Sequence, residues 1–350
     1  MPDDVVSLFS DTGTQPTAAM RAAMAAAEVG DEQEGQDPTV NRLQERVAGL
    51  LGTESALWFP SGTMCNLVAV KLHTQPGDVV IAEAQAHVVR AESGGAALAS
   101  GVLVETIRTA RGIFTAAELE AAFDRVHTVP APWGAPAGLI CVEQTHNLGG
   151  GSVWPLDALA AVADCARGRG VPVHMDGARL LNASTASGVP PAAFAAAVDS
   201  VWIDFTKGLG APIGAVLAGS SAFIRRARRY KQLFGGGMRQ AGIAAAGCLH
   251  ALDHHVERLA VDHAHARLLA RGLDAVDGIR LRSPEPETNI VFFDARGLGM
   301  SNAEFLDRLA ASGVRMSSIG GWIRAVTHLD VSRADIDRVI TAIRDIAHSS

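Results

Sequence analysis

The stretch that decides the fold reads Asp204-Phe205-Thr206-Lys207-Gly208-Leu209-Gly210-Ala211-Pro212. It closes the apolar run Ser200–Phe205, which predicts a buried strand, and its glycines and proline predict a turn. Most lysines lie on solvated surfaces, so a lysine at this junction is unusual. An amine that is partly removed from water loses its proton more readily and becomes a nucleophile. Lys207 is therefore a candidate for covalent chemistry.

The preceding predicted strand, Val171–Asp176, ends in a carboxylate. The carboxyl ends of parallel strands border the ligand crevice of an α/β sheet, and a buried carboxylate there needs a partner. The protonated ring nitrogen of pyridoxal 5′-phosphate (PLP) is such a partner, and the ion pair keeps the ring an electron sink. For Asp176 taken alone, a helix N-cap paired with Arg179 is the alternative.

A third stretch, Pro60-Ser61-Gly62-Thr63, lies between a predicted strand and a predicted helix. Backbone N–H groups and hydroxyls at a helix N-terminus bind phosphate, although this turn by itself is better explained as an ordinary helix cap. Asp176 precedes Lys207 by 31 residues, which leaves room for one helix and one strand. The order of phosphate turn, ring-nitrogen acid and lysine predicts a PLP enzyme with its Schiff base on Lys207. Thr206 could add a hydroxyl to the phosphate site.

Strand-like and helix-like segments alternate from about residue 45 to residue 220. This alternation predicts an α/β fold with a mostly parallel sheet and helices on both faces. The predicted strands are Ala56–Phe59, Val79–Glu83, Val102–Ile107, Gly138–Glu143, Val171–Asp176, Ser200–Phe205 and Ile213–Gly219. The clearest helices are Met64–His73 and Pro155–Arg169.

The remaining sequence has a different pattern. Ala241–Val276 predicts one long helix, and shorter strands and helices follow it. We expect residues 1–245 to form an N-terminal arm and a large PLP-binding domain. We expect residues 246–350 to form the long helix and a small C-terminal α+β domain.

Composition excludes several classes of protein. The net charge of −7, without a long basic run, argues against a nucleic-acid partner. No apolar stretch approaches the roughly 18 residues that a membrane span requires, so no membrane partner is expected. Four widely spaced cysteines without metal-ligand spacing predict reduced thiols, no metal site and a cytoplasmic location.

Together these motifs resemble the low-specificity L-threonine aldolase family, the PLP-dependent, β-eliminating lyase-like enzymes of fold type I. The matching stretches include Gly35–Leu43, Pro60–Met64, Glu143–Asn147, His174–Leu180, Lys207–Pro212, Gly235–Gly242 and Arg324–Val331. The resemblance implies an aspartate-aminotransferase-like fold, a PLP cofactor and an amino-acid substrate. It also implies retro-aldol cleavage of a β-hydroxy-α-amino acid of the L-threonine or L-allo-threonine type, which yields glycine and an aldehyde.

The resemblance further implies roles for single residues. The implied catalytic residues are Lys207, His87 and His146, where His87 is similar to a histidine that stacks on the cofactor ring. The implied cofactor-binding residues are Ser61, Gly62, Thr63, His87, Asp176, Arg179, Thr206, Lys207 and Arg239. The implied substrate-binding residues are Ser10, Glu34, His146, Arg179 and Arg324.

General chemistry agrees with these roles. Arginine binds a carboxylate through two parallel hydrogen bonds, and an amino-acid substrate brings a carboxylate. Cleavage requires that the β-hydroxyl lose its proton, and histidine is the usual base near neutral pH. Without the surrounding motifs, His87 would be interpreted as a loop residue and His146 as the end of a strand.

The chain departs from the family at two positions in the expected substrate pocket. Glu34 and Ala91 stand where relatives commonly have aromatic residues. A different β-substituent, and hence a different PLP-dependent lyase or a synthetic aldolase, is therefore an alternative. A PLP-binding protein without turnover is a third. We also expect a homodimer or homotetramer with shared active sites, to which Asp31–Gly35 and Arg239 contribute.

Overall fold

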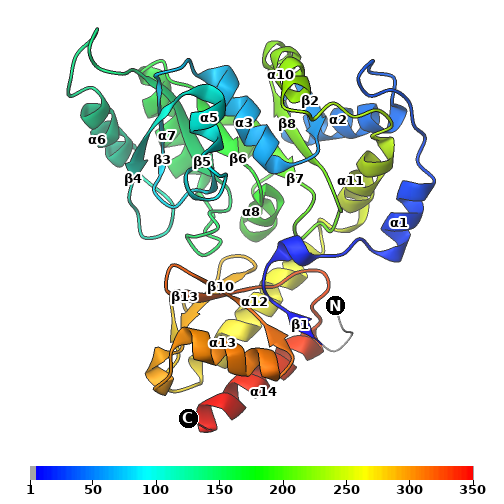
Figure 1. Ribbon diagram of the computed structural model, residues 1–350, viewed down its shortest axis with the longest axis vertical. Coiled ribbons are helices and arrows are strands. Elements are labelled where there is room, and N and C mark those ends of the chain that lie inside the picture. Colours follow the sequence, from blue (N-terminus) through cyan, green and yellow to red (C-terminus); the bar gives the residue numbers. More distant parts are fainter. Residues whose placement is uncertain (1–4, 350) are drawn as a thin grey trace.

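The computed structural model describes residues 5–349 and consists of a large and a small domain (Figure 1). The large domain contains a seven-stranded sheet of order β2-β8-β7-β6-β5-β3-β4. Its strands are β2 (Ser55–Phe59), β3 (Val79–Glu83), β4 (Leu103–Ile107), β5 (Ala137–Glu143), β6 (Val173–Asp176), β7 (Ser200–Asp204) and β8 (Ala215–Gly219). Every strand predicted for this domain is present, and the predicted α/β class is confirmed.

Most neighbouring strands of this sheet are parallel, but β8 runs antiparallel to both β7 and β2. The reversal follows from the short segment 205–214 between β7 and β8, because a parallel connection needs a crossover of a dozen or more residues. Lys207 lies on this segment. Its backbone is therefore held by paired strands on both sides.

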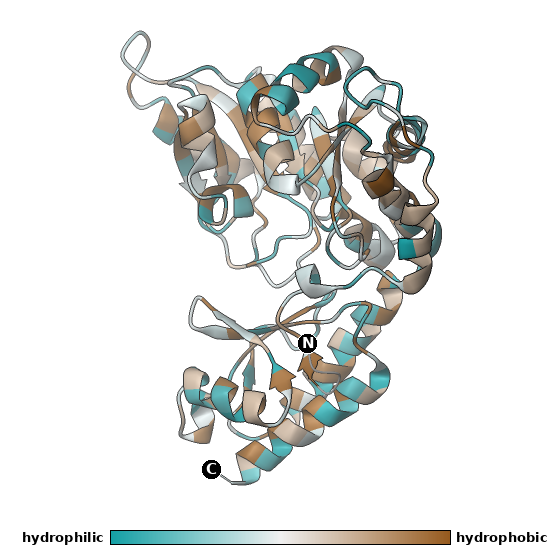
Figure 2. Cartoon of the chain, turned by 45° about the vertical axis from the view of Figure 1, so that its right-hand side comes forward, coloured by the Kyte–Doolittle hydropathy of each residue, from teal (hydrophilic) through white to brown (hydrophobic). Residues whose placement is uncertain are grey.

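Helices cover both faces of the large sheet (Figure 1). They include α2 (Pro38–Leu51), α3 (Gly62–His73), α6 (Ala116–Val126), α7 (Leu156–Gly168), α8 (Leu180–Ser187), α10 (Ser221–Leu233) and α11 (Gly242–His254). Shorter helices are α1 (Ala18–Ala25), α4 (His87–Arg90), α5 (Gly95–Ser100) and α9 (Pro191–Ala196). Hydrophobic residues concentrate on the strands, whereas surface helices carry both hydrophobic and hydrophilic residues (Figure 2). No helix within residues 5–349 is both long enough and apolar enough to span a membrane.

The small domain has a four-stranded antiparallel sheet of order β12-β13-β10-β9. Its strands are β9 (Arg280–Leu281), β10 (Ile290–Asp294), β12 (Ser317–Ile319) and β13 (Trp322–Val326), and its helices are α12 (Leu259–Asp274), α13 (Asn302–Ala311) and α14 (Arg333–His348). The N-terminal strand β1 (Val6–Ser7) pairs in parallel with β11 (Val314–Arg315). The buried side chains of Val6 and Leu8 therefore belong to the core of the small domain.

The single long helix predicted over Ala241–Val276 is wrong, because a turn at residues 255–258 separates α11 from α12. The side chain of His255 is buried at this turn, and its Nδ1 lies 2.7 Å from the carbonyl oxygen of Leu209. This contact joins the turn to the segment that carries Lys207. No glycine or proline marks the break in the sequence.

Two separate cores meet along these helices. Ala245 and Cys248 of α11 and Leu259 of α12 belong to the core of the large domain, while Ala266 and Leu269 of α12 belong to that of the small domain. The predicted division between residues 245 and 246 lies inside α11. That division stays a prediction.

Asp37 connects the start of α2 with the start of α11. Its Oδ1 accepts hydrogen bonds from the N–H groups of Thr39 and Val40 at 3.1 and 3.0 Å. Its Oδ2 accepts from those of Gly30 and Gly242 at 3.2 and 2.8 Å. The carboxylate is fully buried, so its loss would leave several buried donors without an acceptor.

We predict that Asp37→Ala lowers the free energy of unfolding by about 2–4 kcal/mol, because it removes a cap and leaves buried N–H groups unpaired. Thermal unfolding of the purified protein measures the change. The matched control is Ser301→Ala, which removes a solvent-exposed cap at α13 and should cost only about 1 kcal/mol. Equal losses in the two variants would contradict the role given to Asp37.

Candidate active site

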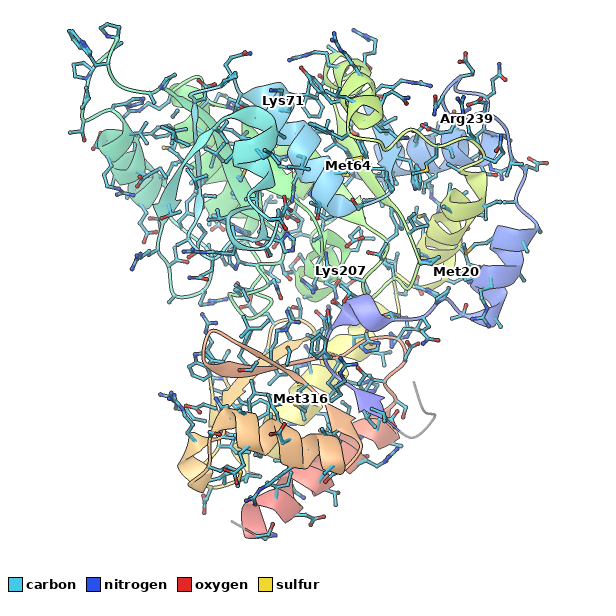
Figure 3. All side chains as sticks on the ribbon, in the orientation of Figure 1. Met20, Met64, Lys71, Lys207, Arg239 and Met316 are labelled. Carbon is cyan, nitrogen blue, oxygen red and sulfur yellow. The ribbon has the colours of Figure 1, made fainter. Side chains whose placement is uncertain are left out.

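A cavity of about 570 Å³ opens at the carboxyl ends of β6 and β7, and residues from both domains line it. Ten residues predicted from the sequence line this cavity: Ser10, Ser61, Gly62, Thr63, His87, Asp176, Arg179, Thr206, Lys207 and Arg324. Figure 3 shows Lys207 on the side of the large domain that faces the small domain. The structure thus brings together segments from residue 10 to residue 324.

The N-terminus of α3 has the features of a phosphate site. The side chain of Ser61 caps the helix by accepting the N–H of Met64 at 3.3 Å, which leaves the hydroxyl proton of Ser61 for a ligand. The N–H groups of Gly62 and Thr63 belong to the first helical turn, where the helix itself offers no acceptor. Three donors and the positive end of the helix dipole therefore face one wall of the cavity.

Gly62 is required at this turn for steric reasons. A Cβ atom on Gly62 would lie 2.1 Å from the indole ring of Trp202. Trp202 is buried on β7 and also lines the cavity. The close approach of the backbone to this ring lets the helix N-terminus border the cavity directly.

Asp176 is buried at the end of β6 and is held by two hydrogen bonds. Its Oδ1 accepts the N–H of Ala178 at 3.1 Å, and its Oδ2 accepts Nδ2 of Asn66 at 2.8 Å. Burial and then the carboxylate of Glu143 raise the pKa of Asp176 above its usual value. A cationic ring nitrogen beside it would stabilise the charged form, so Asp176 fits the cofactor that the sequence predicted.

Asn66 is the centre of a buried network that the sequence did not reveal. Its Nδ2 also donates to Oε1 of Glu92 at 2.7 Å, and its Oδ1 accepts from the indole N–H of Trp202 at 2.7 Å. The ring of His174 lies 3.1 Å from the same Oδ1 and 2.8 Å from the hydroxyl of Ser200. The available signal was a polar residue among the apolar positions 64–70 of α3.

Glu92 and Glu143 hold His87 in the wall of the cavity. Oε1 of Glu92 accepts the proton on Nδ1 of His87 at 3.0 Å, and Oε2 of Glu143 accepts its backbone N–H at 2.7 Å. The hydrogen bond to Glu92 raises the pKa of His87. The side chain of His87 remains 36% exposed, so its Nε2 is accessible to a ligand.

Ligand atoms of His87, Glu92 and Asp176 lie within 4.8 Å of one another, the one set among residues 5–349 that could hold a metal ion. The sequence had predicted no metal site. Asn66 already bridges Glu92 and Asp176, and Glu92 already binds His87. Hydrogen bonds within the protein therefore join all three residues, while Oε2 of Glu92 is buried without a partner.

Lys207 contacts an acid to which the sequence analysis gave no role. Its Nζ lies 2.8 Å from Oδ2 of Asp204, the last residue of β7. Oδ1 of Asp204 accepts both the N–H and the hydroxyl of Thr206, at 2.9 and 2.8 Å. In this geometry the hydroxyl proton of Thr206 is directed at Asp204.

The two predicted carboxylate-binding arginines differ in which of their guanidinium nitrogens already have hydrogen-bond partners. Nε and Nη2 of Arg179 both bind Asp11, each at 2.7 Å. Arg324 donates from Nη1 to Asn147 and from Nη2 to the carbonyl of Phe9, but its buried Nε has no partner. Burial and then the neighbouring Arg179 lower the pKa of Arg324 to about 10, so an anion beside Arg324 would be stabilised.

Three predicted site residues do not line the cavity. His146 is buried behind it, with Nδ1 accepting the N–H of Gly149 and Nε2 lying 3.2 Å from Glu83. Burial lowers the pKa of His146, but the carboxylates of Glu143 and Glu83 outweigh burial and raise it. Glu34 is exposed, and Arg239 pairs with Asp31 far from Lys207 (Figure 3).

The model of the β-eliminating lyase family matches residues 7–296. Low-specificity L-threonine aldolase 1 of Arabidopsis thaliana is 39% identical, over 97% of this chain and 95% of that protein. Low specificity L-threonine aldolase of Escherichia coli (strain K12) is 37% identical, over 96% of this chain and 97% of that protein. Threonine aldolase of Leishmania major, a solved structure, has a TM-score of 0.83 at 23% identity and covers 97% of this chain and 99% of its own.

We predict a pH-dependent contribution of the buried pair between Asp11 and Arg179. Burial alone would raise the pKa of Asp11, but Arg179 holds it well below the usual value. The pair therefore stabilises the fold above the unfolded-state pKa of about 3.9, and its contribution falls as the pH falls below that value. Breaking such a pair costs about 3–5 kcal/mol.

Thermal unfolding of Asp11→Asn and the unchanged protein from pH 8 to pH 3 tests this. The difference in unfolding temperature should be constant above about pH 5 and shrink below about pH 4. Asp253→Asn is the control, because its pair with Arg46 is exposed and should contribute less than about 1 kcal/mol. A difference for Asp11→Asn that does not change with pH would contradict the prediction.

Proposed function

Because the chain belongs to the β-eliminating lyase family, we propose that it is a PLP-dependent aldehyde-lyase that cleaves a β-hydroxy-α-amino acid to glycine and an aldehyde. Relatives that are 37–39% identical over nearly the whole chain are named low-specificity L-threonine aldolases, which supports this reaction class. The observation that carries the proposal is one cavity that contains Lys207, the buried Asp176 and the N-terminus of α3.

The residues of this cavity fit PLP. Ser61, Gly62 and Thr63 would hold its phosphate, Asp176 would pair with its ring nitrogen, and Lys207 would carry it covalently. When bound, PLP supplies an electron sink for the bond that breaks at Cα. Arg179 lines the same cavity with Nε and Nη2 bound to Asp11, and its roles in binding the cofactor and the substrate stay predictions.

We assign the substrate carboxylate to Arg324. The unpartnered Nε of Arg324 and the lowered pKa of its guanidinium support the binding of an anion beside it. Ser10, which lines the same cavity, adds a hydroxyl. Fixing the carboxylate at one end orients the bond between Cα and Cβ, which determines the bond that breaks.

We assign the proton of the β-hydroxyl to His87. With Nδ1 bound to Glu92, Nε2 of the neutral ring is an acceptor, as in other carboxylate–histidine pairs. Glu143 fixes the backbone of His87, and His146 supports Glu143 and Glu83 from behind. A direct contact of His146 with the substrate stays a prediction.

The assembly remains part of the proposal. Glu34 and Arg239 lie outside the cavity of their own chain, which is compatible with a contribution to the site of a second copy. We therefore propose a homodimer or homotetramer with shared active sites. The cytoplasmic location predicted from the sequence also stays a prediction.

We predict that the purified protein with PLP converts L-threonine, L-allo-threonine or L-phenylserine to glycine and the matching aldehyde. Product analysis by chromatography measures the conversion, and Lys207→Ala should abolish it. The chain has three lysines, Lys71, Lys207 and Lys231, so borohydride should attach the cofactor to the Lys207 peptide alone. Lys71→Ala is the matched control and should keep full activity. The 2-oxo acid of unchanged carbon number plus ammonia (2-oxobutyrate from either threonine, phenylpyruvate from phenylserine) would show β-elimination in place of cleavage.

Loss of the Arg324 guanidinium should weaken substrate binding without releasing the cofactor. A hydrogen-bonded ion pair is worth about 1.5–3 kcal/mol, so Arg324→Gln should raise KM for the amino acid by about 10- to 100-fold. Arg280→Gln, an exposed arginine of the same sheet, serves as the control. An unchanged KM in Arg324→Gln would exclude this assignment.

A further inference from the structure

Asp204 is a cavity residue to which neither the motifs nor the proposed reaction gives a role. It ends β7, and its side chain is only 5% exposed. Its Oδ2 lies 2.8 Å from Nζ of Lys207, whose side chain is 18% exposed. The contact therefore lies mostly out of water, where an ion pair is weakly screened.

Asp204 is well ordered by its own neighbours. Its Oδ1 accepts two hydrogen bonds from Thr206, one from the backbone N–H and one from the hydroxyl. Oδ2 is left for Lys207. Each oxygen thus has its own partners, and the carboxylate cannot rotate away without losing the hydrogen bonds to Thr206 in the turn that carries Lys207.

Other charged groups near Lys207 are already engaged. Asp11 binds Arg179 and Asn289, and Asp176 binds Asn66 and the N–H of Ala178. Both act on Lys207 through space, and Arg179 acts in the same way on Asp204. The ring of Trp202, 5.7 Å from Nζ, adds a further favourable contact for a cation. Asp204 is the acid that touches the lysine directly.

A buried carboxylate is stable only beside a cation or several donors. Burial raises the pKa of the thiols of Cys65 and Cys248, so both remain neutral and add no charge near Asp204. The cation in direct contact with Asp204 is the nitrogen of Lys207, because Arg179 is bound to Asp11 and acts on Asp204 only through space. We propose that Asp204 is the positioning residue of the active site that keeps the nitrogen of Lys207 protonated, both when it carries PLP and when a substrate has displaced it.

This inference rests on the proposed function and makes it more specific. An amino acid that displaces Lys207 would form the bond from its own nitrogen as the carbon–nitrogen bond to the lysine breaks. The substrate ammonium would give up two of its three protons, and both would end on Lys207, which changes from a protonated N–H to an ammonium, so no net proton is needed. An ammonium held at Asp204 is a poor base for the Cα proton. Proton removal is thereby left to His87 at the β-hydroxyl, which favours carbon–carbon cleavage over racemisation.

The test is a pH titration of the absorption spectrum of the holoenzyme without any amino acid. Asp204→Asn keeps an oxygen for both Thr206 donors but removes the negative charge beside Lys207. An opposite charge in contact shifts a titration by about 1–3 pH units, so the spectral midpoint of Asp204→Asn should lie lower by that amount. Should this variant fail to hold PLP, Asp204→Ser keeps an acceptor for the turn and should give the same displacement.

Thr206→Val is the matched control. It removes one hydrogen bond to Asp204 and retains the carboxylate, so its midpoint should equal that of the unchanged protein. A midpoint in Asp204→Asn or Asp204→Ser within about 0.3 of the unchanged value would overturn the proposal. An equal displacement in Thr206→Val would also overturn it, because the effect would then come from the shape of the turn.

Borohydride trapping distinguishes this failure from a failure of the proposed function. If the cofactor is trapped on Lys207 and the midpoint does not move in Asp204→Asn, only the role of Asp204 is wrong. If no cofactor is trapped on Lys207 in the unchanged protein, the proposed function is wrong at its first step, and the role of Asp204 falls with it.

Discussion

The buried ion pair of Asp11 and Arg179 is the interaction on which the rest of the site depends. Arg179 follows β6 of the large domain, Asp11 lies in the N-terminal segment, and Asn289 of the small domain donates to the same carboxylate. Three parts of the chain therefore meet at one carboxylate that is fully buried. The pair of Asp11 and Arg179 positions the segment that carries Ser10. It also positions the carbonyl of Phe9, which accepts a hydrogen bond from Arg324.

The cavity is rich in charged groups that compensate one another in pairs. Glu92 binds His87, Asp204 binds Lys207, and Asp11 binds Arg179. The pairing is incomplete at Asp176, which binds only neutral donors, at Nε of Arg324 and at Oε2 of Glu92, both buried without a hydrogen-bond partner. Asp176 and Arg324 are suited to a cationic ring nitrogen and an anionic carboxylate, the two charged groups that a cofactor and an amino acid would bring.

Local patterns predicted much of this structure, because short stretches of sequence are enough to indicate a buried strand or the start of a helix. The seven strands of the large sheet, Lys207 and Asp176 follow from apolar runs and the residues that end them. The same rule applied to β3 and β5 would have found Glu83 and Glu143, which also end apolar strands. By contrast, the contact of Asn66 with Asp176 joins residues 110 positions apart, and no spacing predicts it.

The break between α11 and α12 escaped prediction for a similar reason, because it depends on a contact between His255 and Leu209 rather than on a local signal. The burial of His146 behind Glu83 and Glu143 likewise depends on how three segments pack. The motifs predicted which types of residue form the site, but they did not predict which of these residues line the cavity and which lie outside it.

The pairing of β1 with β11 has a consequence for the order in which the protein forms. Val6 is synthesised before the large domain, but its partner Val314 is synthesised after it. The large domain can fold while β1 is still unpaired, because the strand that pairs with β1 belongs to the small domain. Asp11 can bind Arg179 once the large domain has formed, but β1 and the carbonyl of Phe9 gain their partners Val314 and Arg324 only later, so a nascent chain that already has its large sheet still has no finished site.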